Sequence, residues 1–443
     1  MAVTTHPWFG RGCLSAPEVP AGQLRQVMAR EIADTGIPPR PMLPAAPFLL
    51  PRSSYAELFR AGWQLLDLLR RAVLQCAPTT SGRLSAYGVT EAEYPLFIDD
   101  QVLEEHYASC MARPDVIIGP TGPKFLEFNV SGVTGGTIEL HTLLRGFSSL
   151  YRRRMHEPFE VDDPLAARGR MFRDICADRC LPPRVVLVGS VRDLKHTSSS
   201  RYFDLELESL HRQGFIAEHA EPEMIEDLAA SFPLGLRHFT VPEWLDLGID
   251  LAPVQSALKQ GCLLLSTQTA AFLANKKTLG LVSEGQPWMS AADHHVARRY
   301  LPWTRILGDR GTEFADQRID LLEHVIAHQE SLVLKRGIGM QGLQVTLGSS
   351  VTPENWRSEV ERATAAGDSI VQEYVESERC PVELSPSDDD PDPHRVEVAP
   401  VLSPFLFGRH RGGVWTRFFA TGASGVVSRE GYGALENAAV AEA

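Results

Sequence analysis

Two short apolar segments, residues 115–118 and 124–129, are separated by the sequence GPTGP. Glycine supplies the backbone angles and proline the fixed φ that tight turns need, which predicts that the two segments form a β-hairpin. Because alternate residues of a strand share a face, Glu127 and Asn129 point to one side, while Leu126 and Phe128 point to the other side, into the core. The pattern therefore indicates a sheet with one face in the core and one polar face.

The polar face of this hairpin carries oxygen ligands. If the strands pair across the turn, Asp115 approaches the same face as Glu127 and Asn129. Two carboxylates and an amide oxygen suit the hard cation Mg²⁺, which keeps some of its water and binds phosphates. Arg113, on the same strand as Asp115, is placed to bind a phosphate or carboxylate with two hydrogen bonds. The alternative interpretation is a solvated polar face on an edge hairpin, without any ligand.

A glycine-rich loop lies between two strand-like segments, SLVLK and LQVTLG, within residues 331–376. Gly337, Gly339 and Gly342 match the spacing of dinucleotide-binding loops, but such a loop must lead into a helix, and here a strand follows. The context therefore argues against a Rossmann-type site. What remains is a flexible loop preceded by Lys335, which suits either a flap over a triphosphate or an ordinary surface hairpin. A helix and the strand SIVQEYV complete a predicted β-β-α-β module.

Other segments with clear periodicity extend the prediction along the chain. A strand, a helix and a strand within residues 184–220 form a β-α-β unit, which is typical of an open α/β sheet. Residues 1–52 are rich in proline and are expected to be extended. The remaining predicted elements are helices at 54–76, 138–150 and 270–284, and strands at 261–267, 400–408 and 413–422.

The composition limits the class of function. A net charge of −13 and an isoelectric point near 5.6 argue against nucleic acid as a partner, because phosphate backbones need basic faces. The seven cysteines are scattered without a CxxC pair, which is typical of reduced thiols in a cytoplasmic protein. No apolar run approaches the length of about 18 residues that a transmembrane helix needs. We therefore expect a cytoplasmic protein that acts on small molecules, without a nucleic acid or membrane partner.

The order of these motifs resembles that of the circularly permuted ATP-grasp ligases, which include glutathionylspermidine synthase and eukaryotic glutathione synthetase. Arg113-x-Asp115 followed by Glu127-x-Asn129 looks like the magnesium site of glutathionylspermidine synthase. Some relatives carry an acidic residue in the glycine loop, whereas GIGMQG has none. Further segments that are similar to the family in order and spacing are FLANKKTLGLV, YLPWTR, LVLKRGIGMQG, NWRSEVERA and SIVQEYV.

The resemblance implies a role for each residue of the polar hairpin and for the lid. Asp115, Glu127 and Asn129 would bind Mg²⁺. Arg113, together with Arg417 of the C-terminal strands, would face the acyl phosphate as a catalytic group. Lys276 (or Lys277 in its place) and Lys335 would contact the ATP phosphates, and the lid loop would be formed by Gly337, Gly339 and Gly342. The residues implied to sit at the adenine hinge are Gln372, Glu373 and Tyr374.

The expected fold is α/β, a circularly permuted ATP-grasp with a Rossmann-like substrate domain and a small β-β-α-β lid. The expected segments are a helical and extended N-terminal region at 1–112, the first part of the catalytic core with the magnesium site at 113–183, the substrate domain at 184–275, the ATP-binding lid at 276–378, and a C-terminal return to the core at 379–443.

The activity that the resemblance implies is ATP-dependent ligation of a carboxylate to an amine through an acyl phosphate, with release of ADP and phosphate. The product would be a peptide or peptide-like amide, as in small-peptide or secondary-metabolite synthesis. ATP and Mg²⁺ are the expected cofactors, and a small carboxylate and an amine the expected substrates. Two alternatives use the same residues: a small-molecule kinase that stops at phosphoryl transfer, and a nucleotide-binding scaffold without turnover.

Overall fold

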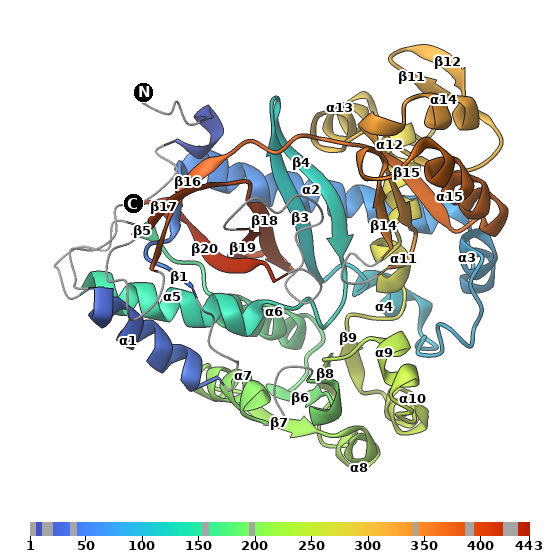
Figure 1. Ribbon diagram of the computed structural model, residues 1–443. Coiled ribbons are helices and arrows are strands. Elements are labelled where there is room, and N and C mark those ends of the chain that lie inside the picture. Colours follow the sequence, from blue (N-terminus) through green and yellow to red (C-terminus); the bar gives the residue numbers. More distant parts are fainter. Residues whose placement is uncertain are drawn as a thin grey trace.

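The structure is a computed structural model (Figure 1), and it describes residues 6–10, 21–35, 42–152, 159–194, 200–339, 344–385, 394–419 and 433–443. Gly342 and the acidic stretch 386–393 lie outside these described residues. The described chain forms mixed α/β layers, as the sequence predicted, with a mainly antiparallel large sheet and a separate parallel sheet.

The largest sheet has seven strands and contains the predicted hairpin. The hairpin pairs with the C-terminal strands, so segments far apart in sequence meet in one layer. The prediction covered the hairpin and two C-terminal strands but missed the strands at the far edge. In order across the sheet, the strands are β2 (Phe48–Leu50), β20 (Leu435–Glu442), β19 (His410–Phe418), β18 (Val401–Phe407), β3 (Met111–Gly119) and β4 (Gly122–Asn129), with β5 (Phe159–Glu160) paired to β20.

Helices cover both faces of this sheet, because its strands bury alternate residues on opposite sides. Leu402 and Leu406 of β18 belong to a core shared with α2 (Arg52–Cys76). Phe405 and Phe407, which alternate with them, belong to a second core shared with α5 (Thr137–Arg152) and α6 (Pro164–Asp178). The long helix α2 buries leucines at helical spacing, as predicted, and it covers the face opposite the polar side of the hairpin.

A separate four-stranded parallel sheet, green in Figure 1, confirms the predicted open α/β unit. In order its strands are β7 (Ile216–Ala220), β6 (Arg184–Val188), β8 (Leu234–Arg237) and β9 (Leu263–Leu265). The strands β6, β8 and β9 are mostly apolar and buried, as expected when both faces are covered, whereas the edge strand β7 is partly exposed. The neighbouring helices are α7 (Arg201–Arg212), α8 (Ile225–Leu228), α9 (Val241–Asp246) and α10 (Ala252–Lys259).

The predicted β-β-α-β module forms a small antiparallel sheet with one additional strand. Thr352 caps the module's helix and Gly367 ends it in the left-handed conformation. The strand after the glycine loop pairs antiparallel with the strand before it, which agrees with the argument against a Rossmann-type loop. The sheet order is β10 (Thr304–Ile306), β15 (Ser369–Glu373), β13 (Leu332–Arg336) and β14 (Val345–Leu347), with α15 (Pro353–Ala366) packed beside it.

Two expectations about helices are wrong. Residues 21–33 form the helix α1 (Ala21–Ala33), because this proline-free stretch of good helix formers interrupts the extended segment. The helix expected at 270–284 is split into α11 (Ala270–Ala274) and α12 (Lys276–Glu284). Asn275 adopts an extended conformation and its side chain accepts a hydrogen bond from the Lys277 N–H, so it caps α12 instead of continuing a helix.

The remaining elements connect these layers. A three-stranded sheet contains β1 (Leu43–Pro44), β16 (Cys380–Ser385) and β17 (His394–Val398), and a hairpin contains β11 (Gly311–Phe314) and β12 (Gln317–Asp320). The other helices are α3 (Thr80–Tyr87), α4 (Gln101–His106), α13 (Ala291–Tyr300) and α14 (Leu321–Ala327). Within the described ranges, no helix is both long and apolar enough to cross a bilayer.

Candidate functional site

The predicted hairpin has the register that its polar face requires. Asp115 lies directly opposite Glu127, and Arg113 lies opposite Asn129. A β-bulge follows Asp115, so the pairing shifts between Asp115 and Val116. The four polar side chains therefore come from facing positions of two paired strands, which brings Arg113, Asp115, Glu127 and Asn129 together as predicted.

Asp115 is buried and is bound by groups from three strands. One carboxylate oxygen accepts a hydrogen bond from Ser403 of β18 at 2.9 Å, and the other lies 2.7 Å from Arg417 Nη2 of β19. Arg113 Nε is 3.5 Å from the same carboxylate. Burial alone would raise the pKa of Asp115, but the Arg417 and Arg113 guanidinium groups outweigh it and hold the pKa below its ordinary range. Asp115 therefore remains ionised.

Arg113 and Arg417 flank one aromatic ring. Their guanidinium carbons lie 5.2 and 4.8 Å from the ring centroid of Trp415, at cation–π distance. Arg113 Nη1 also donates to the carbonyls of Thr134 and Gly135 in the loop that follows the hairpin. Two buried cations share the Asp115 carboxylate, so this corner of the site favours an anion.

Lys276 joins the hairpin to the glycine loop. Its ammonium lies 3.2 Å from Glu127 Oε2 and donates to the Gly339 carbonyl at 3.4 Å, while its backbone N–H donates to the Gly337 carbonyl at 2.8 Å. Lys277 points elsewhere, to the Tyr87 carbonyl at 3.3 Å. Of the two lysines left open by the sequence, Lys276 is the one that the structure places beside the hairpin.

Lys335 enters the same site from the four-stranded sheet of β10, β15, β13 and β14, which we call the lid sheet after the predicted lid. Its buried ammonium donates to Gln372 Oε1 at 2.7 Å. Burial lowers the pKa of Lys335 to about 8, while Glu127 raises it, Lys276 lowers it and Asp115 raises it. The pKa of Lys335 thus responds to both carboxylates of the hairpin, which places this lysine within electrostatic reach of the predicted metal ligands.

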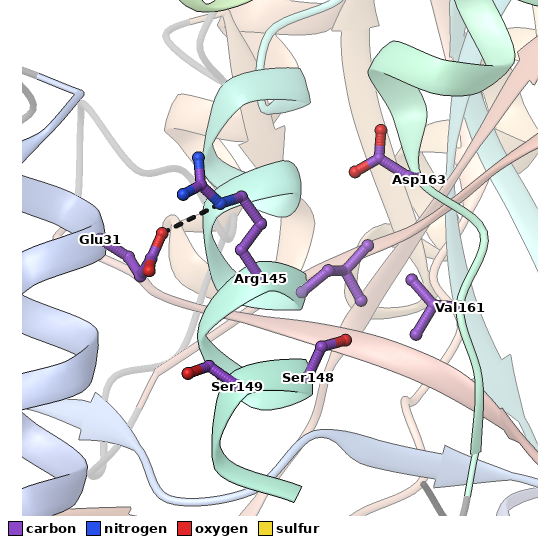
Figure 2. A pocket seen from close by; sticks show the side chains of 7 residues that line it. Glu31, Arg145, Ser148, Ser149, Val161 and Asp163 are labelled. Atoms are coloured by element: carbon purple, nitrogen blue, oxygen red, sulfur yellow. Dashed lines mark ion pairs between the residues drawn. The ribbon is translucent and has the colours of Figure 1, made fainter. Parts of the chain in front are cut away.

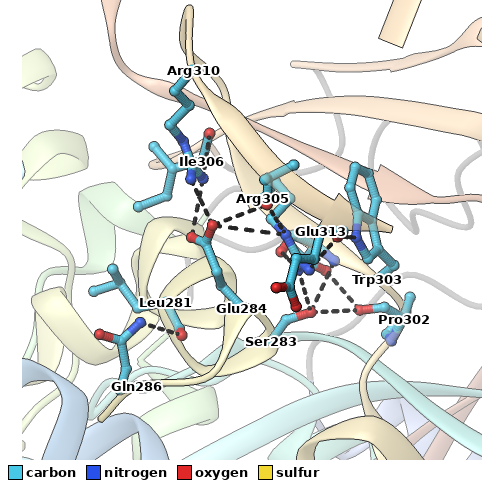
Figure 3. A network of polar contacts seen from close by, with 12 residues as sticks. Leu281, Ser283, Glu284, Gln286, Pro302, Trp303, Arg305, Ile306, Arg310 and Glu313 are labelled. Atoms are coloured by element: carbon cyan, nitrogen blue, oxygen red, sulfur yellow. Dashed lines mark hydrogen bonds and ion pairs between the residues drawn. The ribbon is translucent and has the colours of Figure 1, made fainter. Parts of the chain in front are cut away.

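The three residues predicted at the adenine hinge differ in environment. Gln372 is 1% exposed, whereas Tyr374 is 46% exposed beyond the end of β15. Glu373 accepts a hydrogen bond from the Trp303 backbone N–H at 3.2 Å, and its own N–H donates to the Trp303 carbonyl. Trp303 in turn packs against the guanidinium group of Arg305 on β10. Arg305 belongs to the network with Ser283, Glu284 and Arg310 that is drawn in Figure 3.

The donor set fits Mg²⁺ held jointly with phosphate. Asp115 and Glu127 supply carboxylates. The Asn129 side-chain nitrogen donates to the Arg113 carbonyl at 3.1 Å, so the Asn129 side-chain oxygen is turned away from that hydrogen bond. Among the described residues, no group of three or more His, Cys, Asp or Glu side chains could hold a metal ion alone. These three oxygen donors suit a cation that takes its other ligands from water and phosphates, which is how Mg²⁺ usually binds.

Several neighbours of the site could not be assigned from the sequence. Ser403 belongs to β18, which pairs with the hairpin, and Trp415 belongs to the next strand, β19; the register of both strands was unknown. Thr304 accepts a hydrogen bond from Gln372, and it lies on β10, a strand that the sequence pattern did not predict. The one local signal for this packing was the glycine at position 136. Gly136 has φ of +82°, and a side chain there would clash with Trp415.

A pocket of about 460 Å³ lies apart from these residues. It is lined by α1, α5 and the segment before α6, where Figure 2 shows Arg145 reaching toward Glu31, with Asp163 on the other side. None of the predicted site residues lines it.

The comparisons with known proteins show the fold. No family model and no curated protein sequence matches the chain. A glutathione synthetase-like effector from Globodera pallida, solved in its apo form, matches with a TM-score of 0.55 and 10% identity over 96% of this chain and 99% of that one. A candidate γ-glutamylcysteine synthetase from Methylobacillus flagellatus KT matches with a TM-score of 0.42 and 12% identity, over 85% of this chain and 87% of that one, too distant to carry an argument. The chain thus has the fold of a glutathione synthetase-like protein.

Proposed function

We propose that this protein is an ATP-dependent ligase that forms an amide bond between a small carboxylate and an amine, on a circularly permuted ATP-grasp fold. The observation that carries the proposal is the meeting of two lysines with the polar hairpin. Lys276 contacts Glu127 directly, and the buried Lys335 ammonium responds electrostatically to Glu127 and Asp115. A magnesium–triphosphate complex needs cations for its phosphates and oxygen ligands for its metal. Here the lid region supplies the cations and the large sheet supplies the carboxylates on the opposite side.

The proposed chemistry has two steps. A carboxylate oxygen of the acid attacks the γ-phosphorus of ATP, the bond to the bridging oxygen breaks, and ADP leaves. The amine nitrogen then attacks the acyl carbon, phosphate leaves, and the amine gives up a proton to yield the amide. Mg²⁺ held by Asp115, Glu127 and Asn129 would neutralise negative charge on the phosphates.

The protein's own residues supply position and charge. Lys276 and Lys335 hold the phosphates and keep their negative charge compensated during transfer. Arg113 and Arg417, fixed by Trp415 and Asp115, face the acyl phosphate and stabilise its oxygens. The lid would exclude water, which would otherwise hydrolyse the acyl phosphate. An unprotonated amine is a competent nucleophile, so holding it in line is the main requirement.

The experiment is a trapping screen. The protein is incubated with Mg·ATP, single amino acids or other small acids, and hydroxylamine in place of the natural amine. A ligase gives a hydroxamate together with ADP and phosphate. Release of AMP and pyrophosphate would contradict the acyl phosphate route, and ADP formed with a stable phosphorylated product and no hydroxamate would identify a kinase.

A further inference from the structure

Gln372 sits at the centre of the lid sheet. In the register of the sheet it lies opposite Thr304 of β10 on one side and Val333 of β13 on the other. Lys335 is two residues along β13 from Val333, on the same face, so it is a diagonal neighbour of Gln372. Gln372, Thr304 and Lys335 are all buried. Three polar side chains on one covered face of a small sheet require an explanation, since buried polar groups are costly unless they are paired.

Both the oxygen and the nitrogen of the Gln372 side-chain amide form hydrogen bonds within the protein. Its oxygen accepts from Lys335 Nζ at 2.7 Å, and its nitrogen donates to Thr304 Oγ1 at 3.0 Å and to the Leu126 carbonyl at 3.4 Å. The Thr304 hydroxyl donates to the Pro302 carbonyl at 3.0 Å, so it must accept from Gln372. The Leu126 carbonyl can only accept. The amide orientation is therefore fixed, with the nitrogen toward the large sheet and the oxygen toward Lys335.

This arrangement holds the Lys335 ammonium without cancelling its charge. An ammonium group has three N–H donors, and a neutral amide oxygen occupies one of them. A carboxylate at the same place would form an ion pair and compete with an anionic ligand. The Leu126 carbonyl belongs to β4 beside Glu127, so the same amide also ties the lid sheet to the strand of the predicted metal site.

We propose that Gln372 is a positioning residue that aims Lys335 at the phosphates of the nucleotide, and that its side chain takes no part in recognising the base. This inference rests on the proposed function, in which Lys335 binds those phosphates. Contact with the adenine then belongs to the accessible end of β15, at Glu373 and Tyr374. The role differs from the base-contacting one that the sequence implied for Gln372.

The test compares two ligands and two glutamine variants. Binding of Mg·ATP and of adenosine is measured by calorimetry, direct or by competition, for the wild type, Gln372→Met and the control Gln329→Met. Gln329 also lies in the lid and donates two hydrogen bonds to backbone carbonyls, but it does not contact Lys335. Gln372→Met should weaken Mg·ATP binding about tenfold or more, as expected for losing a hydrogen bond to a charged group, and leave adenosine binding unchanged. The control should alter neither.

The possible results distinguish failure of the proposed function from failure of the positioning role of Gln372. If the wild type does not bind Mg·ATP, the proposed function fails. If it binds and Gln372→Met binds equally well, the positioning role fails. If Gln372→Met weakens adenosine binding as much as ATP binding, the side chain contacts the base or only supports the fold, and the inference is overturned. Should Gln372→Met not fold, Thr304→Val removes the hydroxyl that orients the amide, and a selective loss of ATP binding is expected there too.

Discussion

At the residue scale, the site depends on how a few buried charges are paired. Asp115 is shared between Arg417, Arg113 and Ser403, and Glu127 is paired with Lys276. Under the proposed function Glu127 would bind the metal, so the Lys276 ammonium that is now paired with Glu127 is well placed to move to a phosphate when metal and nucleotide bind. The Lys276–Glu127 pair is the contact that we expect nucleotide binding to exchange.

The two adjacent lysines at the start of α12 should therefore differ in effect. Lys276→Met removes the cation beside Glu127 and should weaken Mg·ATP binding by at least about tenfold, because a charge-assisted contact to phosphate is lost. Lys277→Met removes a contact to the Tyr87 carbonyl and should change binding by less than about threefold. Calorimetric titration of both variants makes the comparison, and equal losses would contradict the assignment of Lys276.

Asp115 should make stability depend on pH. Its folded-state pKa lies below the ordinary value, so its contribution is fully present above the unfolded pKa of about 4 and is lost as pH falls through the folded pKa. Asp115→Asn leaves two buried arginines without their carboxylate and should cost roughly 3–5 kcal/mol near neutral pH. Urea unfolding of both proteins should show this difference shrinking toward about pH 3. A difference that does not change with pH would contradict the ionised, arginine-bound state.

At the element scale, the loop between β4 and α5 follows the hairpin and accepts hydrogen bonds from Arg113. Gly136 has φ of +82°, and a Cβ there would lie 2.5 Å from a ring carbon of Trp415. Gly132 in the same loop would place a Cβ 2.1 Å from the Arg237 carbonyl at the end of β8. Glycine is required at both positions because the loop is packed tightly between the large sheet and the carboxyl end of the parallel sheet.

Gly136→Ala tests this packing against a matched control. Gly88 ends α3 with φ of +69°, and a Cβ there would meet no neighbouring atom within 4 Å. Gly88→Ala should therefore cost only the left-handed strain, about 1 kcal/mol. Gly136→Ala should cost about 2–4 kcal/mol, because displacement of Trp415 adds to the strain. Denaturant unfolding measures both, and equal losses would show that Trp415 is not tightly held against the loop.

At the scale of the whole molecule, three sheets converge on the site. The Glu378 N–H donates to the Ile118 carbonyl, which ties the chain after the lid sheet to the hairpin. Gln372 reaches Leu126 of β4, and the Gly132 loop reaches the parallel sheet. The residues that we propose to bind phosphates thus come from the lid region and the proposed oxygen ligands from the large sheet, while the loop after the hairpin packs against the parallel sheet.

Sequence patterns predicted the parts of this arrangement that are local. The GPTGP turn and the alternation of residues predicted the hairpin, and the order of apolar segments predicted the β-β-α-β module. The β-bulge after Asp115, which places Asp115 opposite Glu127, was not predicted. The partners from β18 and β19 were beyond reach, because pairing between residues 115 and 403 is set by tertiary packing and not by spacing. The break at Asn275 was missed for a different reason: an asparagine within an apolar periodicity gives only a weak signal of a helix cap.

The central claim, ligation through an acyl phosphate, has a direct test once the screen yields an acid and an amine. The acid is supplied with ¹⁸O in its carboxylate, and the phosphate released during amide formation is analysed by mass spectrometry. We predict that one ¹⁸O atom is transferred to inorganic phosphate and that ADP is the nucleotide product. Label found in AMP, or unlabelled phosphate accompanying amide formation, would contradict the acyl phosphate route.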